Sequence, residues 1–356
     1  MVETVKKAAA AGETLDISGK VGEVIEDIMY KMIFGRPSNS EDDNLNLKLL
    51  IKEISRLAGA FNLSDFVPCL APLDLQLKKV SKILDKFMEK IIDEHEQAAG
   101  SNPEEQKPHR IFVHVMVSLL DKPMNPHEKE QDFIIDKTNI KAIMLDMISG
   151  ALETSAIAIE WALSELLRHP RVMFGLQQEL KIVVGRSRMV EESDLPPLTY
   201  LAMVVKESLR LHPIGPLLIP HKSMEDIMID GYFIPKKSRI IVNTWSIGRD
   251  PDVWSNNAEE FFPERFIDSN IDLRGQDFQL IPFGSGRRGC PGMQLGLITI
   301  RLVSAQLVHC FDWELPVELD MSEKFGLSMP RANPFLVKAT YRYLIIECKI
   351  NRKKRI

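Results

Sequence analysis

One long helical pattern limits what this chain can fold into. Between about Lys137 and His169 no proline interrupts the apolar periodicity, and the pair His169-Pro170 closes it. At 1.5 Å per residue, a helix over this range would be about 50 Å long, enough to cross a whole globular domain. We therefore expect this helix to organise the core.

The remaining sequence predicts a mainly α fold with a small β-sheet. Ser18 is placed to cap the first of the other helices, and the apolar, proline-punctuated segment 61–77 predicts a long loop. Asp230 and Gly231 separate two β-rich runs and predict a hairpin. Amphipathic helical patterns cover residues 18–35, 50–58, 78–93, 110–120, 172–184 and 198–212.

Composition excludes several classes of protein. Of the 356 residues, 45% are hydrophobic and 27% charged, so the chain can bury a core and is not of the disordered type. A net charge of -5 gives no basic surface for nucleic acid, and we treat the basic run at 351–355 as a solvated end. The four cysteines form no close pair, which fits a reducing compartment. No uncharged apolar stretch of about 18 residues indicates a membrane span.

The most informative local feature is a cysteine loop. Residues 282–292 read Pro-Phe-Gly-Ser-Gly-Arg-Arg-Gly-Cys-Pro-Gly, and an apolar helical pattern follows to Phe311. Pro291 suits the first position of that helix, which would make Cys290 its N-cap, where the helix dipole favours a thiolate. Four glycines allow the backbone to approach a large, flat group without Cβ clashes.

Three interpretations of this loop compete. Cys290 is a structural cysteine in a glycine turn, a nucleophile, or a thiolate ligand to haem iron. A nucleophile needs a histidine base within reach, and no local signature supplies one. Haem ligation also accounts for Arg287 and Arg288, because an arginine pairs with a haem propionate.

The spacing Phe283-x-x-Gly286-x-Arg288-x-Cys290-x-Gly292 resembles the haem loop of the cytochrome P450 family, most closely its plant-type microsomal branch. The resemblance implies that haem (heme, iron protoporphyrin IX) is the cofactor and that Cys290 is the axial iron ligand. It further implies that Phe283, Gly286 and Arg288 belong to the haem-binding site.

A charged pair and a later arginine extend the resemblance. Glu207 and Arg210 lie three residues apart on one helix face, which taken alone is an ordinary surface pair. In the family, such a Glu-x-x-Arg pair joins an arginine of a Pro-Glu-Arg-Phe segment, which is Arg265 here. This network would hold the fold and take no part in the chemistry.

The hexapeptide Gly-Ala-Leu-Glu-Thr-Ser at 150–155 resembles the oxygen-activation motif of the family. Without that context, a threonine and an acid in mid-helix are an ordinary hydroxyl and a solvated carboxylate. With it, Thr154 would hydrogen-bond dioxygen, Glu153 would orient a water for proton delivery, and Gly150 would leave room for haem. Ala151 departs from the glycine that is more common in the family.

His221 occupies the position where relatives often place a propionate partner, although an exposed loop histidine explains it equally well. The apolar segment 214–218 would border the substrate pocket, which indicates a lipophilic small molecule as substrate. Segment 61–77 corresponds to the access region, where peripheral membrane contact is an alternative to tertiary packing.

The resemblance runs from near residue 1 to about residue 343 and predicts a single cytochrome P450 domain over 1–356, incomplete at its N-terminus. The first strands, the early helix with a Trp-x-x-x-Arg pattern and the membrane anchor have no counterpart. The implied activity is monooxygenation with electrons from NADPH-cytochrome P450 reductase, at the cytosolic face of the endoplasmic reticulum membrane. The alternatives are a haem-binding protein without turnover and an inert truncated fragment.

Overall fold

The computed structural model describes residues 1–37, 47–59, 75–101, 111–122 and 134–342. It divides into two compact units. The first consists of Met1–Val21 and the described chain from Thr154 onward, and the second of the described residues within Gly22–Glu153. Each unit is presented separately.

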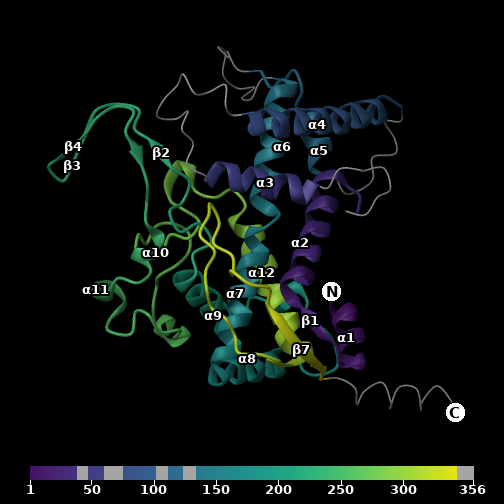
Figure 1. Cartoon of the computed structure of the whole chain (residues 1–356), viewed down its shortest axis with the longest axis vertical. Helices are drawn as coiled ribbons and strands as arrows, with labels where there is room; N and C mark the ends of the chain where they lie inside the picture. Colours follow the sequence, from purple (N-terminus) through teal and green to yellow (C-terminus); the bar gives the residue numbers. More distant parts are fainter. Residues whose placement is uncertain (38–46, 60–74, 102–110, 123–133, 343–356) are drawn as a thin grey trace. The chain divides into compact units, whose positions relative to one another are not determined.

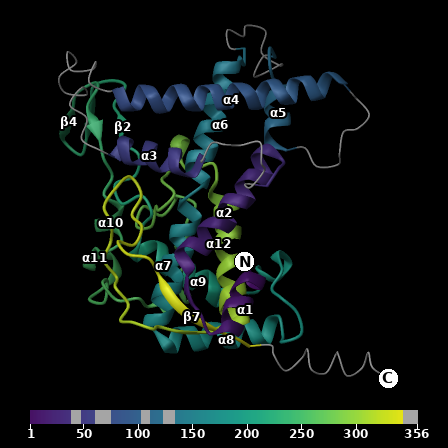
Figure 2. The same cartoon turned by 45° about the vertical axis from the view of Figure 1, so that its right-hand side comes forward.

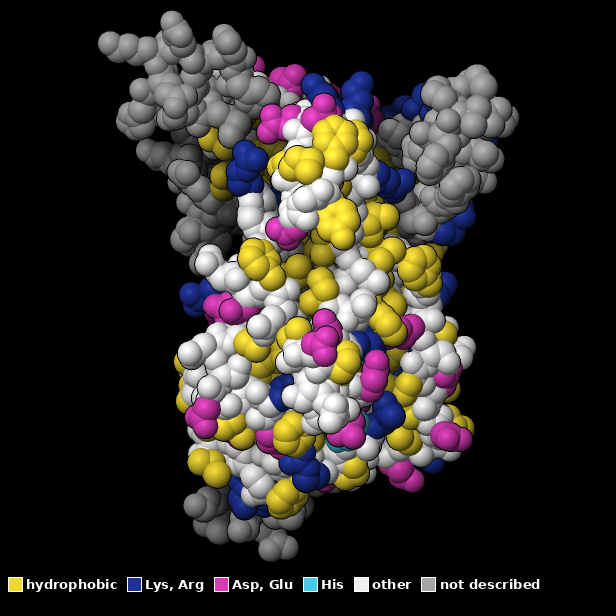
Figure 3. Space-filling model, turned by 90° about the vertical axis from the view of Figure 1, so that its left-hand side faces the viewer, with side chains coloured by type: hydrophobic (Ala, Val, Ile, Leu, Met, Phe, Trp, Pro, Cys, Tyr) yellow, Lys and Arg dark blue, Asp and Glu magenta, His cyan; other side chains and the backbone are white. Residues whose placement is uncertain are grey.

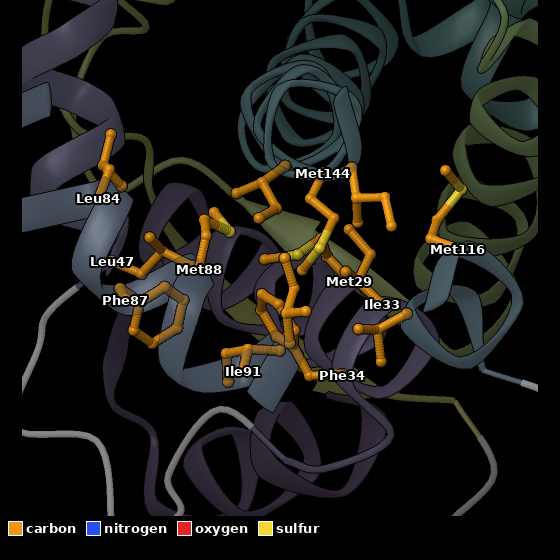
Figure 4. Close-up of a cluster of buried hydrophobic side chains, with 14 of the residues drawn as sticks. Met29, Ile33, Phe34, Leu47, Leu84, Phe87, Met88, Ile91, Met116 and Met144 are labelled. Atoms are coloured by element: carbon orange, nitrogen blue, oxygen red, sulfur yellow. The ribbon is translucent and has the colours of Figure 1, made fainter. Parts of the chain in front are cut away.

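The second unit is helical in its described residues and is built around a methionine-rich core. Figure 4 shows Met29, Met88 and Met144 among the buried side chains of this core, with Phe34 and Phe87 nearby. The rings of Phe34 and Phe87 meet edge to face, with their centroids 5.8 Å apart. The contributing helices are α2 (Ile17–Phe34), α3 (Leu47–Gly59), α4 (Leu75–Ser101), α5 (Phe112–Ser118) and α6 (Lys137–Ala151).

These helices confirm the predicted patterns and change two details. Helix α4 begins at Leu75, so the last residues of the predicted loop 61–77 are helical, while residues 61–74 lie outside the described residues. Helix α2 begins at Ile17, and Ser18 does not cap it. The Ser18 hydroxyl instead donates to Glu160 Oε1 and accepts from the Phe335 backbone N–H at 3.0 Å.

The prediction of a single long helix over 137–169 is wrong in one respect, because the structure has two helices in this range. Helix α6 ends at Ala151 and α7 (Thr154–Arg168) begins after a turn at Leu152 and Glu153. The division follows Gly150, and glycine disfavours a helix interior by about 1 kcal/mol relative to alanine. Every residue of α7 from Ile157 to Leu166 is buried, so α7 does organise the first unit.

Helices and a three-stranded sheet complete the first unit. The N-terminal strand β1 pairs antiparallel with β7, and β7 pairs with β6 on its other edge. Figures 1 and 2 both show β7 beside α1, near α8. This sheet was not predicted. The remaining elements are α1 (Val2–Ala11), β1 (Thr14–Asp16), α8 (Pro170–Val183), η3 (Glu192–Asp194), α9 (Thr199–Leu211), β2 (His221–Lys222), β3 (Ile227–Ile229), β4 (Tyr232–Ile234), β5 (Arg239–Ile240), α10 (Thr244–Ile247), α11 (Pro251–Trp254), η4 (Pro263–Phe266), η5 (Gly286–Arg288), α12 (Met293–Cys310), β6 (Phe311–Glu314) and β7 (Leu336–Tyr341).

The predicted hairpin is confirmed. Strands β3 and β4 pair antiparallel, and Asp230 and Gly231 adopt φ values of 48° and 82°, as a tight two-residue hairpin turn requires. The hairpin carries exposed hydrophobic side chains, with Tyr232 76% exposed, on the face that Figure 3 presents.

Among the residues that the structure describes, two helical segments, Lys137–Arg168 and Met293–Cys310, are long and apolar enough to cross a membrane by length and composition alone. Core helices of soluble proteins have the same composition, and these segments contribute to the cores of the two units.

Candidate active site

The cysteine loop is closed by its own backbone. The Cys290 N–H donates to the Phe283 carbonyl at 2.8 Å, and the Gly289 N–H donates to the Gly286 carbonyl at 3.1 Å. Gly286 has a φ of 68°, a conformation that favours glycine, and a Cβ built on it meets no described atom within 4 Å. The loop therefore has a fixed shape, an open surface at Gly286 and an exposed thiol at Cys290.

The start of α12 differs from the prediction. The helix begins at Met293 with Gly292 as its N-cap, so Cys290 lies two residues before the cap. The reason is that Pro291 and Gly292 form a turn, with Gly292 at φ -85° and ψ 5°. A Cβ built on Gly292 would lie 3.8 Å from Cys290 Sγ, so the thiol remains beside the positive end of the helix dipole.

Helix α12 is buried mainly in its second half, although its sequence is apolar over most of its length. Leu295 in the first turn is 39% exposed, whereas Val303 and most residues after it are buried. The first turns follow directly from the exposed cysteine loop, and the later turns belong to the core.

The beginnings of α7 and α12 meet next to this loop. A Cβ built on Gly296 would lie 3.8 Å from Ser155 Oγ and 4.0 Å from Phe283 Cε1. Because Ser155 follows Thr154 directly, the predicted oxygen-activation threonine begins the helix that lies against the start of α12. Ser155 and Gly296 were not singled out from the sequence, since their small size acquires meaning only from this contact.

An apolar residue in an unusual conformation also borders the loop. Leu218 has a positive φ of 49°, and its Cδ1 would lie 4.0 Å from a Cβ built on Gly284. A non-glycine residue in this region costs about 1 to 3 kcal/mol, and such residues cluster at functional sites. The predicted pocket segment 214–218 thus reaches the cysteine loop, although the strain at Leu218 has no signal in the sequence.

Three predicted propionate partners or basic neighbours lie exposed in the first unit. His221 is in β2, opposite Ile240 of β5, and Arg287 and Arg288 are in η5. Within the described chain, none of these three side chains makes a hydrogen bond or ion pair. All three are therefore available to an anionic ligand.

Gly150 and Glu153 belong to the second unit. Gly150 is exposed in the last turn of α6, and a Cβ built there meets no described atom within 4 Å. Glu153 is half-buried in the turn before α7.

The predicted structural network lies fully assembled in the first unit. The buried Glu207 carboxylate accepts from Arg210 Nε at 2.8 Å and from Arg265 Nε at 2.8 Å. Arg210 also donates to the carbonyls of Gly248 and Ala258, at 2.5 and 2.6 Å. These bonds hold α9 against η4 and the segment before it. Gly248 was not predicted, yet a Cβ there would collide with the Arg210 carbonyl oxygen.

A second buried polar cluster was not predicted either. The His212 ring stacks on Trp161, with centroids 4.0 Å apart and an interplanar angle of 2°. Its Nε2 lies 2.8 Å from Glu165 Oε1 and its Nδ1 lies 3.3 Å from Glu323 Oε1. Burial alone would raise the pKa of Glu165, but the hydrogen bond to His212 and nearby cations hold it below its ordinary value. The cluster fastens α7 to α9.

Comparison with known proteins identifies the family to which this chain belongs. The model of the family described as Cytochrome P450 matches residues 1–338, and the chain belongs to this family. A zebrafish cytochrome P450 solved with abiraterone superposes with a TM-score of 0.75 at 25% identity, over 96% of this chain and 75% of that one. The fold is thus the cytochrome P450 fold, mainly α with small sheets.

The similar plant proteins show which kind of cytochrome P450 this chain is. The chain is 56% identical to cytochrome P450 CYP736A12 of Panax ginseng, over 96% of this chain and 69% of that protein. It is 40% identical to cytochrome P450 71A1 of Persea americana, over 95% of this chain and 68% of that protein. Flavonoid 3',5'-hydroxylase 2 of Petunia hybrida is 40% identical, over 92% of this chain and 63% of that protein. The chain is a cytochrome P450 monooxygenase of plant metabolism, in a family whose cofactor is haem and which draws electrons from a redox partner.

Proposed function

We propose that this chain binds haem through the Cys290 thiolate and oxidises a lipophilic small molecule, with electrons from NADPH-cytochrome P450 reductase. The observation that carries the proposal is the exposed Cys290 thiol in a backbone-closed glycine loop, beside the beginnings of α7 and α12. The match of the family model across residues 1–338 supports the inference that residues 1–356 act as one cytochrome P450 domain.

The residues present suit haem. The accessible thiol of Cys290 provides the soft donor that such an iron centre takes, and the open side of Gly286 admits a planar group without a Cβ clash. Arg288 and His221, which have no partner among the described side chains, would pair with the propionates. Phe283 would pack against the macrocycle from the same loop.

Bound haem with a thiolate ligand supplies the activation of dioxygen. The protein residues would hold protons and exclude water around it. Thr154 would offer its hydroxyl as a hydrogen-bond donor in the oxygen-binding space, Glu153 would orient a water that delivers protons, and Gly150 would leave space beside them. Ser155 and Gly296 would keep α7 and α12 close enough to limit the entry of other water.

The substrate side is apolar. Leu218 reaches the cysteine loop from a segment rich in leucine, isoleucine and proline, which favours a lipophilic molecule over a charged one. Two relatives bear the names flavonoid 3',5'-hydroxylase 2 and flavonoid 3'-monooxygenase, in agreement with a lipophilic ring compound. By the same family relationship, we place the enzyme at the cytosolic face of the endoplasmic reticulum membrane, with peripheral membrane contact.

Haem content and the ferrous-CO spectrum test the proposal. We expect the chain expressed with haem precursor to carry about one haem per molecule and to show the red-shifted Soret band of a thiolate-ligated iron. Cys290→Ala should lose the band and most of the haem. Cys310→Ala is the matched control, because Cys310 is buried at the end of α12, and it should keep both.

Equal haem content in the wild type and Cys290→Ala would overturn the ligand assignment. A red-shifted band without NADPH consumption in the presence of the reductase would indicate a haem-binding protein without turnover. A wild type that folds but takes up no haem would indicate an inert fragment.

A further inference from the structure

A small polar cavity of about 240 Å³ lies in the first unit, apart from every residue assigned above. Lys181 of the last turn of α8, Arg186, His309 of α12, Asp312 of β6 and Arg342 line it. Gln177 and Gly185 complete the lining in the described part of the chain, and no lining residue there has an apolar side chain. The cavity therefore does not suit the lipophilic substrate of a monooxygenase.

The lining carries an excess of positive charge. Asp312 is the only carboxylate among the described lining residues, and this group is already shared between Arg342 Nε and Gln177 Nε2, each at 3.4 Å. Arg342 is also held by a hydrogen bond from its Nη1 to the Val308 carbonyl at 3.2 Å. Three cations thus face one engaged anion.

Among the described residues, Lys181 and Arg186 make no hydrogen bond or ion pair with another side chain. Gly185, with a φ of 84°, reverses the chain between them and brings both to the same cavity. The neighbouring Arg188 differs, because its guanidinium is occupied by Asp194 in two 2.6 Å hydrogen bonds.

The wall of the cavity is fixed by His309. This ring is 2% exposed, and its Nε2 lies 3.1 Å from the Arg188 carbonyl. Because a carbonyl only accepts hydrogen bonds, Nε2 must carry the proton. A cavity that combines a buried, hydrogen-bonded histidine with the cations Lys181 and Arg186 is suited to a compact anion.

We propose that this cavity binds the phosphate group of a small phosphorylated molecule. Guanidinium groups match phosphate oxygens in a forked geometry, and a lysine adds a point charge, so Arg186, Arg342 and Lys181 together suit a group of two or more negative charges. The volume lies below the roughly 300 to 1,000 Å³ of typical drug-sized ligand pockets, which favours a phosphomonoester or pyrophosphate over a larger ligand.

Calorimetric titration of the purified full chain with pyrophosphate, at constant ionic strength, tests this site without any haem readout. We expect saturable binding of one pyrophosphate per chain. Arg186→Gln and Lys181→Gln should each weaken it about tenfold, since each removes one charge-assisted hydrogen bond worth about 1.4 kcal/mol. Asp312→Asn should tighten it, because it removes the competing carboxylate.

Lys324→Gln is the matched control, since Lys324 is an exposed lysine outside the cavity. The affinity of this variant for pyrophosphate should equal that of the wild type. Thermal melts followed by circular dichroism establish that each variant folds. Equal weakening in Lys181→Gln and Lys324→Gln would overturn the proposal, as would a lack of saturable binding. Cosedimentation with phosphatidic acid vesicles, compared with phosphatidylcholine vesicles, decides whether the phosphate belongs to a lipid headgroup or to a free solute.

Discussion

At the residue scale, one buried carboxylate accepts hydrogen bonds from two guanidinium groups, of which that of Arg210 is fully buried. Glu207 accepts from both Arg210 and Arg265, and it also receives the Phe262 N–H at 2.8 Å. With Glu207 and the Arg210 side chain fully buried, water cannot replace a lost partner. The network therefore depends on the charge of a single side chain.

We expect Glu207→Gln to destabilise the protein by about 3 to 5 kcal/mol, because it leaves two positive charges without a counter-charge in the interior. Urea unfolding followed by tryptophan fluorescence measures the loss. Arg171→Gln is the control, since it breaks the Arg171–Glu264 ion pair at a site where Arg171 is 65% exposed, and it should cost no more than about 1 kcal/mol. Similar losses in the two variants would contradict the prediction.

At the element scale, the one-turn helix η3 depends on a charge pair. Asp194 accepts two hydrogen bonds from Arg188 and one from the Glu191 N–H at 2.9 Å, which lowers the pKa of its carboxyl to about 2. A pKa that is lower in the folded state than in the unfolded state stabilises the protein above the unfolded value, near 3.8. This contribution is lost as the pH falls toward 2.

Asp194→Asn should therefore destabilise the protein at pH 5, and the difference from the wild type should shrink as the pH falls through 3. Chemical unfolding at a series of pH values measures the difference in the free energy of unfolding. A difference that stays constant down to pH 2 would mean that Asp194 contributes by packing alone.

Local patterns revealed most helices and the hairpin from the sequence alone. Apolar periodicity predicted α2, α8 and α9, and the pair Asp230-Gly231 predicted the β3–β4 turn. The division between α6 and α7 was missed because Gly150 disfavours a helix by only about 1 kcal/mol. Tertiary contacts can outweigh so small a cost, so the sequence alone does not show whether the helix continues or breaks. Strand β1 was missed because it spans only three residues and its partner lies more than 300 residues away.

In the candidate site, too, the features encoded by local sequence were predicted and those created by distant contacts were not. The cysteine loop was recognisable because its residue types and spacing are local, and the charged network because its two motifs are short. Ser155, Gly248 and the positive φ of Leu218 were not recognisable, since each gains its meaning from contacts with distant segments. The N-cap of α12 was misplaced by two residues because both Pro291 and Gly292 are compatible with a helix start and with a turn.

At the scale of the whole molecule, the first unit joins the two ends of the described chain. Leu15 of β1 lies opposite Val337 of β7, both are buried, and the Ile17 N–H donates to the Phe335 carbonyl at 2.9 Å. The buried side chain of Leu15 thus holds the start of the chain to its last described strand.

We expect Leu15→Ala to lower the free energy of unfolding by about 2 to 5 kcal/mol, as for other large-to-small substitutions in a core. Thr14→Ala, at the exposed neighbouring position of the same strand, should change it by less than about 0.5 kcal/mol. Differential scanning calorimetry compares the two variants. Equal melting temperatures would show that β1 is not part of the cooperative unit.

This pairing has a consequence for biosynthesis. The partner of β1, strand β7, is synthesised only about 320 residues after it. At about 5 to 20 residues per second, the nascent chain must keep β1 without this partner for roughly 15 to 65 seconds. Chaperones that shield exposed segments during translation should therefore raise the yield of this protein more than those that act on released chains.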